Sequence, residues 1–586
     1  MEKWVVSAKR ADFKQIARRF GIDQVTARII RNRDIIGEDA IEEYLHATLE
    51  QFHSPWKMKD METGVSILQR KLKERKHIRV IGDYDIDGVF SVYILYSALR
   101  RCGGKVDYAI PHRIIDGYGL NARLVRQARE DGVDTILTCD NGIAAAEEIA
   151  LAKDLGIDVV ITDHHEVPYQ EAADGTRQYQ IPLADAVINP KQPDCTYPFS
   201  SLCGAAVAFK LVQALYEAMG IPEEAFSFLE YAAFATIGDV MDLVGENRTL
   251  VKEGLKALNH TKNYGLRALA ARNQIPMGTI KPYHVGFVLG PCINACGRLD
   301  TAERALRLLL AEDEYAAAVC AGELYDLNLS RKEMTEQGTQ EAIALVEGSS
   351  LKQDKVLVVF LPDCHESLAG IIAGRIREQY NRPAFLLTKS ADGVKGSGRS
   401  IEAYSMFEEM SKCKELFTKY GGHPMAAGLS LPEENVDVFR RRLNEYTSLT
   451  EDDLRGKIVI DVPMPLDYIS KPLIEEFQLL EPFGKSNEKP VFADRNIRIM
   501  SLGVFGQKRN VCRMHIRSQG GTELEAVYFG QIDGFLSFLE EKYGTYALRQ
   551  AMQGQEGDLY VSFLYYPEIN VYNGRESLQV IVKNYC

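Results

Sequence analysis

The short segment around residue 83 constrains the fold more than any other part of this chain. Residues 80–81 are apolar and predict the end of a buried strand, and residues 89–99 are apolar enough to form a buried helix. Asp83, Asp85 and Asp87 stand at alternate positions between them. Ligands of an open α/β sheet bind at the edge where strands give way to helices, so this segment predicts both a fold class and a site.

The three carboxylates predict a metal site. Acids this close together repel one another unless a cation neutralises them. An acidic turn on the protein surface is the alternative, and the pattern D-x-D-x-D-G alone does not separate the two. The choice depends on whether other segments supply further ligands.

The composition is that of a globular protein with several domains. At 586 residues the chain is too long for one hydrophobic core, so we expect roughly two to four domains. It has no run of about eighteen apolar residues and no apolar signal region, which predicts a cytoplasmic protein that crosses no membrane. The 11 cysteines lack the spacing of a zinc site and are expected to be reduced thiols. A net charge of −13 argues against a protein that coats nucleic acid with its whole surface, but it does not exclude a local basic groove.

Short apolar strands alternate with helices after residue 78, which predicts a parallel sheet. The predicted strands are residues 135–139, 159–162 and 186–188, and the predicted helices are residues 144–155 and 224–236. A polar cluster follows each strand at its carboxyl end. Turn chemistry alone does not explain that recurrence.

Six side chains from four segments form the expected ligand set. They are Asp85, Asp87, Asp140, His164, His165 and Asp239. Carboxylate oxygen together with imidazole nitrogen suits Mn²⁺ and, with more water, Mg²⁺. Zinc stays open, although no thiolate is among the candidates.

Four motifs at these positions resemble the DHH phosphoesterase superfamily. They are residues 82–88 (GDYDIDG), 140–142 (DNG), 163–165 (DHH) and 238–239 (GD). Within it, the chain is similar to the RecJ family of bacterial single-strand-specific exonucleases. Further matches are residues 111–113, 116–120, 189–191, 202–205, 245–248 and 290–299. The family usually has arginine where Cys292 stands, a small-Thr-Ser sequence at residues 89–91, and tryptophan where Cys364 stands; these departures concern substrate contacts, not metal ligands.

The resemblance implies a 5′→3′ exonuclease that hydrolyses phosphodiester bonds of single-stranded DNA in repair and recombination, with two divalent cations, Mn²⁺ or Mg²⁺. We assign Asp140 as the bridge between two cations about 4 Å apart, completed by the other five ligands. Asp83 orients ligands from outside the metal shell or ligates directly. His423 is expected to stabilise developing charge. Expected substrate contacts are Arg113, Arg298, Arg375, Ser397 and Arg399, of which all but Arg375 are expected to form a pocket for a terminal 5′-phosphate.

The second half of the chain predicts two more modules. Residues 312–347 predict one long helix, which leads to strands at 355–361 and 384–388. Residues 396–400 read as a loop of small residues with one arginine, and residues 420–428 place a histidine between glycines; together they resemble the DHH-associated domain. After residue 457 the short β-rich runs resemble an OB-fold, which stacks bases on aromatic side chains beside basic ones. Candidates there are Lys508, Arg509, Arg513, Arg517, Tyr528, Phe529 and Tyr572, although buried β aromatics are the more common case.

These patterns predict a division into consecutive parts. They are an N-terminal helical extension (1–70), a DHH catalytic domain (71–310), a connecting helix (311–350), a DHH-associated substrate-binding domain (351–450) and an OB-fold-like nucleic-acid-binding domain (451–586). Arginines 18, 19, 28, 31 and 33 in the extension belong to a solvated helical face or to a nucleic-acid path. The expected partners of this monomer are single-stranded DNA, a helicase and a single-strand-binding protein. Two other functions stay open: a DHH phosphodiesterase for nanoRNA or cyclic dinucleotides, and a non-catalytic DHH replication scaffold.

Overall fold

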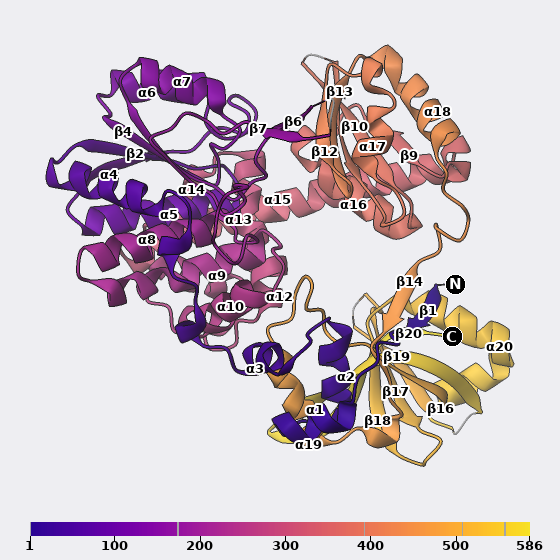
Figure 1. The fold of residues 1–586 in the computed structure, drawn as a ribbon. Coiled ribbons are helices and arrows are strands. Elements are labelled where there is room, and N and C mark those ends of the chain that lie inside the picture. The colour runs from indigo at the N-terminus through magenta and orange to yellow at the C-terminus, as the bar shows by residue number, and fades with distance from the viewer. Residues whose placement is uncertain (1, 173–174, 392, 507, 556–557) are drawn as a thin grey trace. The chain divides into compact units, whose positions relative to one another are not determined.

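The computed structural model describes residues 2–172, 175–391, 393–506, 508–555 and 558–586 (Figure 1). The chain forms two compact units, of which one is Gln51–Gly456 and the other combines Met1–Glu50 with Lys457–Cys586. Within the described ranges, no helix is both long and apolar enough to cross a membrane.

A five-stranded parallel sheet forms the base of the larger unit. Its strands, in spatial order, are β3 (Lys105–Ala109), β2 (His77–Ile81), β4 (Thr135–Cys139), β5 (Asp158–Thr162) and β8 (Ala186–Ile188). In register, Ile81 pairs with Thr138 and Cys139 pairs with Thr162, so the carboxyl ends of β2, β4 and β5 lie at one edge. The predicted parallel sheet is confirmed, and its polar strand ends converge.

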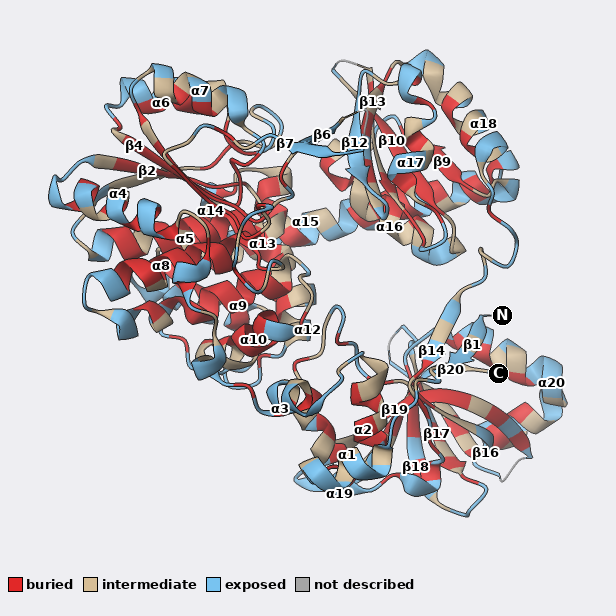
Figure 2. Cartoon of the chain, viewed as in Figure 1, coloured by how far each residue is buried: buried red, intermediate tan, exposed pale blue. Residues whose placement is uncertain are grey.

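Helices cover both faces of this sheet. The helices α6 (Ala122–Glu130) and α7 (Ala146–Asp154) pack on one face, where Val125 and Ile149 share a core with Ile136 and Val159. On the other side lie α4 (Met61–Lys73), α5 (Ile86–Arg101) and α8 (Gly204–Ala218), followed by α9 (Leu229–Gly238) and α10 (Gly245–Leu258). Most of α5 and α8 is buried (Figure 2). The ends of α5, α8 and α9 are therefore fixed relative to the sheet edge by apolar packing.

The predicted connecting helix is α15 (Glu314–Glu347), a helix of 34 residues. It packs against α11 (Tyr264–Arg272), α13 (Gly290–Leu299) and α14 (Glu303–Leu309), and further along against α16 (Ala369–Tyr380). Each of these contacts lies within the larger unit. The helix therefore ties the parallel-sheet part to the module that follows.

That module is built on a second five-stranded sheet. Its order is β12 (Lys419–His423), β13 (Ala426–Leu431), β11 (Gly393–Arg399), β10 (Ala384–Ser390) and β9 (Leu357–Phe360), with α18 (Val436–Tyr446) packed against it. The prediction of a loop at 396–400 was wrong, because residues 396–399 belong to the central strand β11. Its glycines leave room for larger neighbours: a Cβ at Gly398 would lie 2.3 Å from the Met406 sulfur. Small residues here mark close packing between strands and not a turn.

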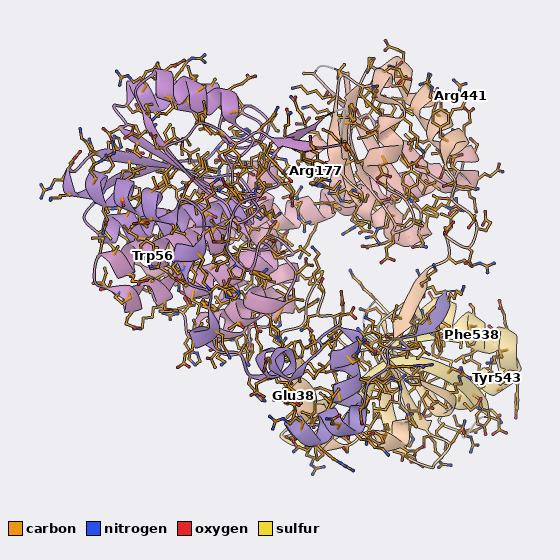
Figure 3. The ribbon with its side chains drawn as sticks, in the orientation of Figure 1. Glu38, Trp56, Arg177, Arg441, Phe538 and Tyr543 are labelled. Atoms are coloured by element: carbon orange, nitrogen blue, oxygen red, sulfur yellow. The ribbon has the colours of Figure 1, made fainter. Side chains whose placement is uncertain are left out.

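The smaller unit contains a closed five-stranded barrel. Its strands are β16 (Phe492–Phe505), β17 (Val511–Arg517), β18 (Glu523–Tyr528), β19 (Leu559–Tyr572) and β20 (Arg575–Tyr585). The strand β16 pairs with both β17 and β19, and β20 pairs parallel with β18 and antiparallel with β19, which closes the ring. The helix α20 (Ile532–Met552), which carries Phe538 and Tyr543 (Figure 3), joins β18 to β19. This connectivity is that of an OB-fold.

The N-terminal segment does not form the separate 1–70 extension that we predicted. The strand β1 (Lys3–Val6) pairs with β14 (Lys457–Ile460), and α1 (Phe13–Phe20), α2 (Gln24–Asn32) and α3 (Glu38–His46) follow it. Ile29 and Ile30 are buried in one core with Leu466 and Phe477, whereas α4 packs on the parallel sheet. Burial of this apolar face joins residues 2–50 to a segment more than 400 positions away in the sequence.

The aromatic residues of the barrel that were predicted to contact bases differ in their exposure to solvent. Tyr528 is only 9% exposed and belongs to the barrel core, whereas Phe529 and Tyr572 are 59% and 71% exposed. Arg517 forms an ion pair with Glu523, 2.6 Å apart. Phe529 and Tyr572 therefore keep the exposure that base stacking requires, and Tyr528 does not.

Candidate metal centre

Asp140 lies at the carboxyl end of β4, where two elements hold it in place. Its φ of 60° is left-handed, and its amide donates to the carbonyl of Thr162 at 3.1 Å. On the other side, a Cβ at Gly204 would lie only 2.6 Å from the Cβ of Asp140. Asp140 is 2% exposed. A glycine at the start of α8 is therefore what lets this carboxylate approach the centre so closely.

Asp163 orients the two histidines that follow β5. Its Oδ1 accepts the backbone N–H groups of His164 at 2.7 Å and His165 at 3.1 Å, and lies 2.7 Å from His165 Nδ1. A carboxylate can only accept, so Nδ1 of His165 donates. Nε2 is then the nitrogen that His165 offers to a cation.

Backbone N–H groups at two helix starts hold the acids of the first segment. Asp85 caps α5, because its Oδ1 accepts from the amides of Asp87 and Gly88 at 3.0 and 3.1 Å. Asp87 in turn accepts from the amides of Gly204 and Ala205 at 2.6 and 2.8 Å. These contacts orient both carboxylates without the use of a basic side chain.

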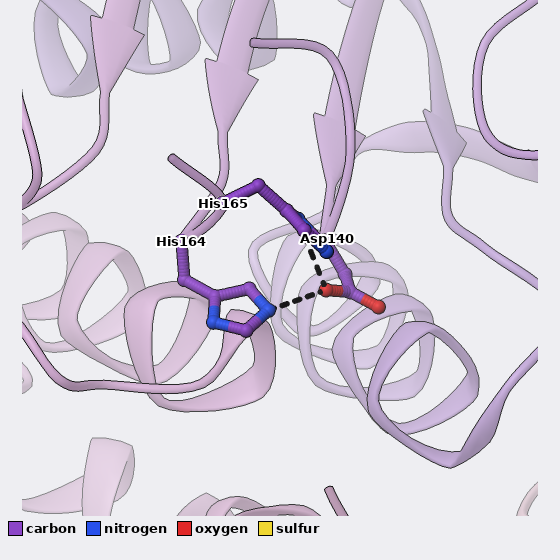
Figure 4. Close-up of side chains that lie close together, drawn as sticks. All are labelled: Asp140, His164 and His165. Atoms are coloured by element: carbon purple, nitrogen blue, oxygen red, sulfur yellow. Dashed lines mark ion pairs between the residues drawn. The ribbon is translucent and has the colours of Figure 1, made fainter. Parts of the chain in front are cut away.

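Two groups of side chains have the geometry of a cation site. One is Asp140, His164 and His165, and the other is Asp87, His164 and Asp239; within each, one ligand atom per residue lies within 4.8 Å of the others. His164 Nε2 lies 3.1 Å and His165 Nδ1 lies 4.0 Å from Asp140 Oδ1 (Figure 4). His164 Nε2 also lies 3.5 Å from Asp87 Oδ2. The structure thus brings five of the six predicted ligands together. It places Asp85 beside them as the cap of α5.

Burial and mutual repulsion disfavour the charged forms of these acids. Burial and the charge of Asp87 raise the pKa of Asp85, and burial with the charges of Asp87 and Asp85 raises that of Asp140 well above its usual range. Burial and the charge of Asp85 raise the pKa of Asp83 to about 8. Burial lowers the pKa of His164 and so favours the neutral imidazole that binds metals. A cation would relieve the repulsion among these groups.

An unsatisfied polar atom in the cluster fits the same ligand. Asp140 Oδ1 is buried and makes no hydrogen bond within the described part of the chain. Leaving such groups without a partner is costly in a folded protein. Carboxylate oxygens with imidazole nitrogens and no thiolate form a donor set suited to Mn²⁺ or Mg²⁺. The residues present therefore fit divalent cations.

A cavity of about 460 Å³ gathers most of the predicted substrate contacts. Its lining includes Arg113, Arg298, Ser397 and Arg399, and also Lys395 and Lys419. The guanidinium of Arg298 donates to the Ser367 carbonyl at 2.8 Å, and that of Arg399 donates to Ser397 Oγ at 3.1 Å. Burial and the neighbouring charge of Arg113 lower the pKa of Arg298 to about 10. Cationic groups that repel one another in a cavity favour an anionic ligand.

Comparison with known proteins agrees with this architecture. The family models described as the DHH family N-terminal domain, the DHHA1 domain and the RecJ OB domain match residues 77–238, 353–449 and 460–584. A relative from Escherichia coli (strain K12) named single-stranded-DNA-specific exonuclease RecJ is 33% identical over 555 residues, covering 90% of this chain and 91% of the relative. The chain belongs to the RecJ family.

Other RecJ proteins extend the comparison. A relative of the same name from Bacillus subtilis (strain 168) is 35% identical over 534 residues, which cover 90% of this chain and 66% of the relative. A crystal structure of RecJ in complex with Mn²⁺ from Thermus thermophilus matches with a TM-score of 0.81 at 28% identity, covering 100% of this chain and 79% of that chain. The fold predicted for the RecJ family is therefore the fold of this chain.

Two residues predicted from the RecJ resemblance are not brought to the cavity. Arg375 on α16 forms an ion pair with Glu336 of α15, 2.8 Å apart, and His423 is exposed at the end of β12. Among the described residues, neither belongs to the cavity lining. Arg375 lies on the helix face turned to α15, which is a reason to expect a structural role for it.

Sequence reasoning missed three contributors to the site of this RecJ protein. Tyr118 donates to the Asp140 carbonyl at 3.0 Å, and its hydroxyl lies 2.9 Å from His165 Nε2. Lys395 and Lys419 line the cavity. Tyr118 stands in a segment already matched to the family, which was the available signal. The two lysines lie near glycines in β-strands, and no local sequence pattern distinguished them from ordinary surface lysines.

One departure from the RecJ family pattern has a structural account. Cys292 is fully buried, and its sulfur accepts from the side-chain amides of Asn328 at 3.3 Å and Asn273 at 3.8 Å. Arg331 donates to Asn328 at 3.0 Å. The cysteine therefore fills a core position between α11, α13 and α15.

Gly204→Ala should weaken binding of the divalent cation. The new Cβ would displace Asp140, so we expect kcat/KM to fall about tenfold to a hundredfold, with a higher Mn²⁺ concentration needed for half-maximal activity. Titrating activity with Mn²⁺ measures the effect. The control is Gly322→Ala, also in a helix, where a Cβ would meet open space. Unchanged Mn²⁺ dependence in Gly204→Ala would contradict the close approach of Gly204 to Asp140.

Proposed function

We propose that this chain is an exonuclease that hydrolyses single-stranded DNA from its 5′ end with two divalent cations, Mn²⁺ or Mg²⁺, in DNA repair and recombination. The observation that carries the proposal is a buried carboxylate–imidazole cluster in the same unit as a cavity lined by arginine and lysine. Relatives named single-stranded-DNA-specific exonuclease support the substrate.

The cluster residues would hold the cations. A bound pair of divalent cations supplies an ionised water near neutral pH and neutralises charge on the phosphoryl oxygens. Asp140 remains our proposed bridge, because a carboxylate has several lone pairs, whereas one imidazole nitrogen has a single lone pair. Asp85, Asp87, His164, His165 and Asp239 complete the set.

Other residues of this chain position the ligands. Asp163 holds His165 in the ligating orientation. Asp83 accepts the Gly119 amide at 3.1 Å, and we assign it to orienting the ligands from outside the metal shell. His423 is exposed at the end of β12, and its role in stabilising developing charge remains our proposal.

The cationic cavity would bind and recognise the terminal 5′-phosphate of the strand. A terminal phosphate carries up to about one more negative charge than an internal diester, given a second pKa near 6. Arginine gives bidentate, charge-assisted bonds to such a group. Arg113, Arg298 and Arg399 come from both modules of the larger unit, and their shared lining supports one site for a 5′-phosphate. The 5′→3′ direction follows from that contact, because the metals themselves do not distinguish strand polarity.

We assign the binding of long DNA strands to the smaller unit, which contributes none of the proposed metal ligands. A fragment of residues 51–456 should still cleave short single strands, whereas its KM for long strands should rise at least about tenfold. Both chain segments of the smaller unit must be removed, because deletion of 457–586 alone would expose the core face of residues 2–50. If a folded 51–456 fragment bound long strands as tightly as the full chain, the assignment would be wrong.

Substrate comparison separates this proposal from the alternatives. With Mn²⁺ present, we expect rapid digestion of a long 5′-phosphorylated single strand, slow digestion of a dinucleotide and none of a blunt duplex. A preference for the dinucleotide would favour the nanoRNA or cyclic-dinucleotide phosphodiesterase, and no hydrolysis would favour the replication scaffold. The OB-fold unit favours a polymer substrate. A helicase and a single-strand-binding protein as partners and a monomeric state remain predictions that rest on the family resemblance, and a cytoplasmic location remains a prediction from the sequence.

A further inference from the structure

A second cavity, of about 760 Å³, lies within the smaller unit and contains none of the residues assigned above to the metal centre or the cationic cavity. Three segments of that unit meet around it: β1, the helix α20, and the ends of β18 and β20. Its lining includes Glu2, Trp4, Tyr528, Phe538, Glu541 and Tyr585. Four aromatic rings and two carboxylates are thus gathered in one concave surface.

One face of α20 forms a wall of this cavity. Gly534, Ser537, Phe538 and Glu541 follow the spacing that places residues on one side of a helix. The first two are small and leave the cavity open: a Cβ at Gly534 would meet only ordinary contacts, the nearest at 3.8 Å. Phe538, labelled in Figure 3, is half-buried. The wall therefore has an open part, an aromatic ring and a carboxylate, in that order along the helix.

Three of the four aromatic rings form one connected group. The ring centroids of Phe538 and Tyr585 are 5.1 Å apart, and those of Tyr528 and Tyr585 are 5.7 Å apart. Gly530 leaves room for the Tyr528 ring, since a Cβ there would lie 2.1 Å from the hydroxyl oxygen. Trp4 belongs to β1, and the pairing of β1 with β14 fixes the position of this strand. Trp4, Phe538 and Tyr585 are only half-buried and can offer ring faces to a ligand, whereas Tyr528 is buried.

The charged side chains that line the cavity are both acidic, Glu2 and Glu541. Glu2 lies close enough to Tyr528 for its charge to help raise the pKa of that phenol, after the effect of burial. Glu541 is exposed at the end of the α20 wall. Among the described residues that line the cavity there is no lysine, arginine or histidine. Two carboxylates beside aromatic faces repel a phosphate backbone and attract a cation.

We propose that this cavity binds an arginine or lysine side chain from a basic segment of a partner protein. The cation would lie over the rings of Trp4 or Phe538 and pair with Glu541 and Glu2. Cations over aromatic faces are attracted by the ring quadrupole, and nearby carboxylates add to that attraction. The chain already makes such a contact next to the cavity, where Lys542 Nζ lies 5.3 Å from the centroid of Phe538. This cavity would therefore recruit a protein, whereas the exposed basic and aromatic residues of the barrel would contact DNA.

The natural tryptophan content offers a direct reporter. The sequence has two tryptophans, Trp4 in the cavity and Trp56 in the larger unit, where its indole donates to Glu217 at 2.9 Å. In a full-length Trp56→Phe protein, all tryptophan emission comes from Trp4. The probe is an acetylated and amidated octapeptide of six glycines and two arginines. Matched peptides replace the arginines with glutamate or with serine.

We expect the arginine peptide to change Trp4 emission in a saturable way and the other two peptides to have no effect. Glu541→Gln, made in the Trp56→Phe protein, should weaken arginine-peptide binding about fivefold to tenfold, while Glu540→Gln removes the same charge one residue away and should change it less than about twofold. Ser537→Phe, which fills the cavity, should abolish the signal while the protein keeps its melting temperature.

Three results would overturn the proposal. One is equal binding of the arginine and serine peptides, and another is equal weakening by Glu540→Gln and Glu541→Gln. The third is competition by a twelve-nucleotide thymidine strand, which would make the cavity part of the DNA path. Because the assay measures binding and not hydrolysis, its outcome is independent of the proposed exonuclease activity.

Discussion

Asp140→Ala should lower kcat/KM on single-stranded DNA by at least roughly a thousandfold, with the fold intact. Asp140 Oδ1 faces both histidines of the cluster, and it is the oxygen we assign as the bridge between the cations. Without it, neither the water nor the phosphoryl oxygens would be held between two charges. Single-turnover hydrolysis with saturating Mn²⁺ measures the loss.

The same variant should lose activity without losing thermal stability. In the metal-free protein Asp140 is buried among acids that repel it, so its removal should leave the melting temperature unchanged or raise it. The increase in melting temperature that Mn²⁺ gives to the wild-type protein should be lost. Near-normal turnover in a folded Asp140→Ala protein would exclude Asp140 as a bridging ligand.

Arg399→Ala should lower kcat/KM about tenfold to a hundredfold on 5′-phosphorylated strands and several-fold less on 5′-hydroxyl strands. Arg399 lines the same cavity as Arg113 and Arg298, and its guanidinium is largely withdrawn from water, which lowers its pKa. A bidentate contact to a terminal phosphate is lost when either partner is absent. Measuring both proteins on both strands isolates that coupling.

Arg375→Ala is the matched control for this experiment. It removes the same side chain from the same module, but Arg375 pairs with Glu336 and does not line the cavity. We expect it to change kcat/KM less than about twofold on either strand. An equal loss of kcat/KM on both strands in Arg399→Ala would mean that Arg399 contacts the DNA backbone without distinguishing its 5′ end. The residue that recognises the 5′-phosphate would then lie elsewhere.

The parallel sheet and its ligand edge were predictable because their determinants are local. Short apolar runs specify β2, β4 and β5, and in a parallel sheet such runs place the residues that follow them at one edge. Asp140 and His164 are therefore neighbours in space although they come from different strands. The acids of the first segment were found for the same reason.

The parts that sequence reasoning got wrong depend on distant pairings. The strand β11 contains three glycines and resembles a loop, and it is a strand because β10 and β13 pair with its two edges. The segment of residues 2–50 looked like a separate extension, and its partner strand begins only at Lys457. The substrate contact predicted for Arg375 stays a prediction, and the structure pairs this side chain with Glu336 of α15.

The polarity of digestion tests the central claim most directly. A single-stranded 40-nucleotide DNA with a phosphate at its 5′ end is labelled with ³²P either in that terminal phosphate or at the 3′ end, and digested with limiting protein and Mn²⁺. We predict that the 5′ label appears as mononucleotide at the earliest times, that the 3′ label stays in a steadily shortening strand, and that EDTA stops both. Early release of the 3′ label, or digestion unchanged by EDTA, would contradict a metal-dependent 5′→3′ exonuclease.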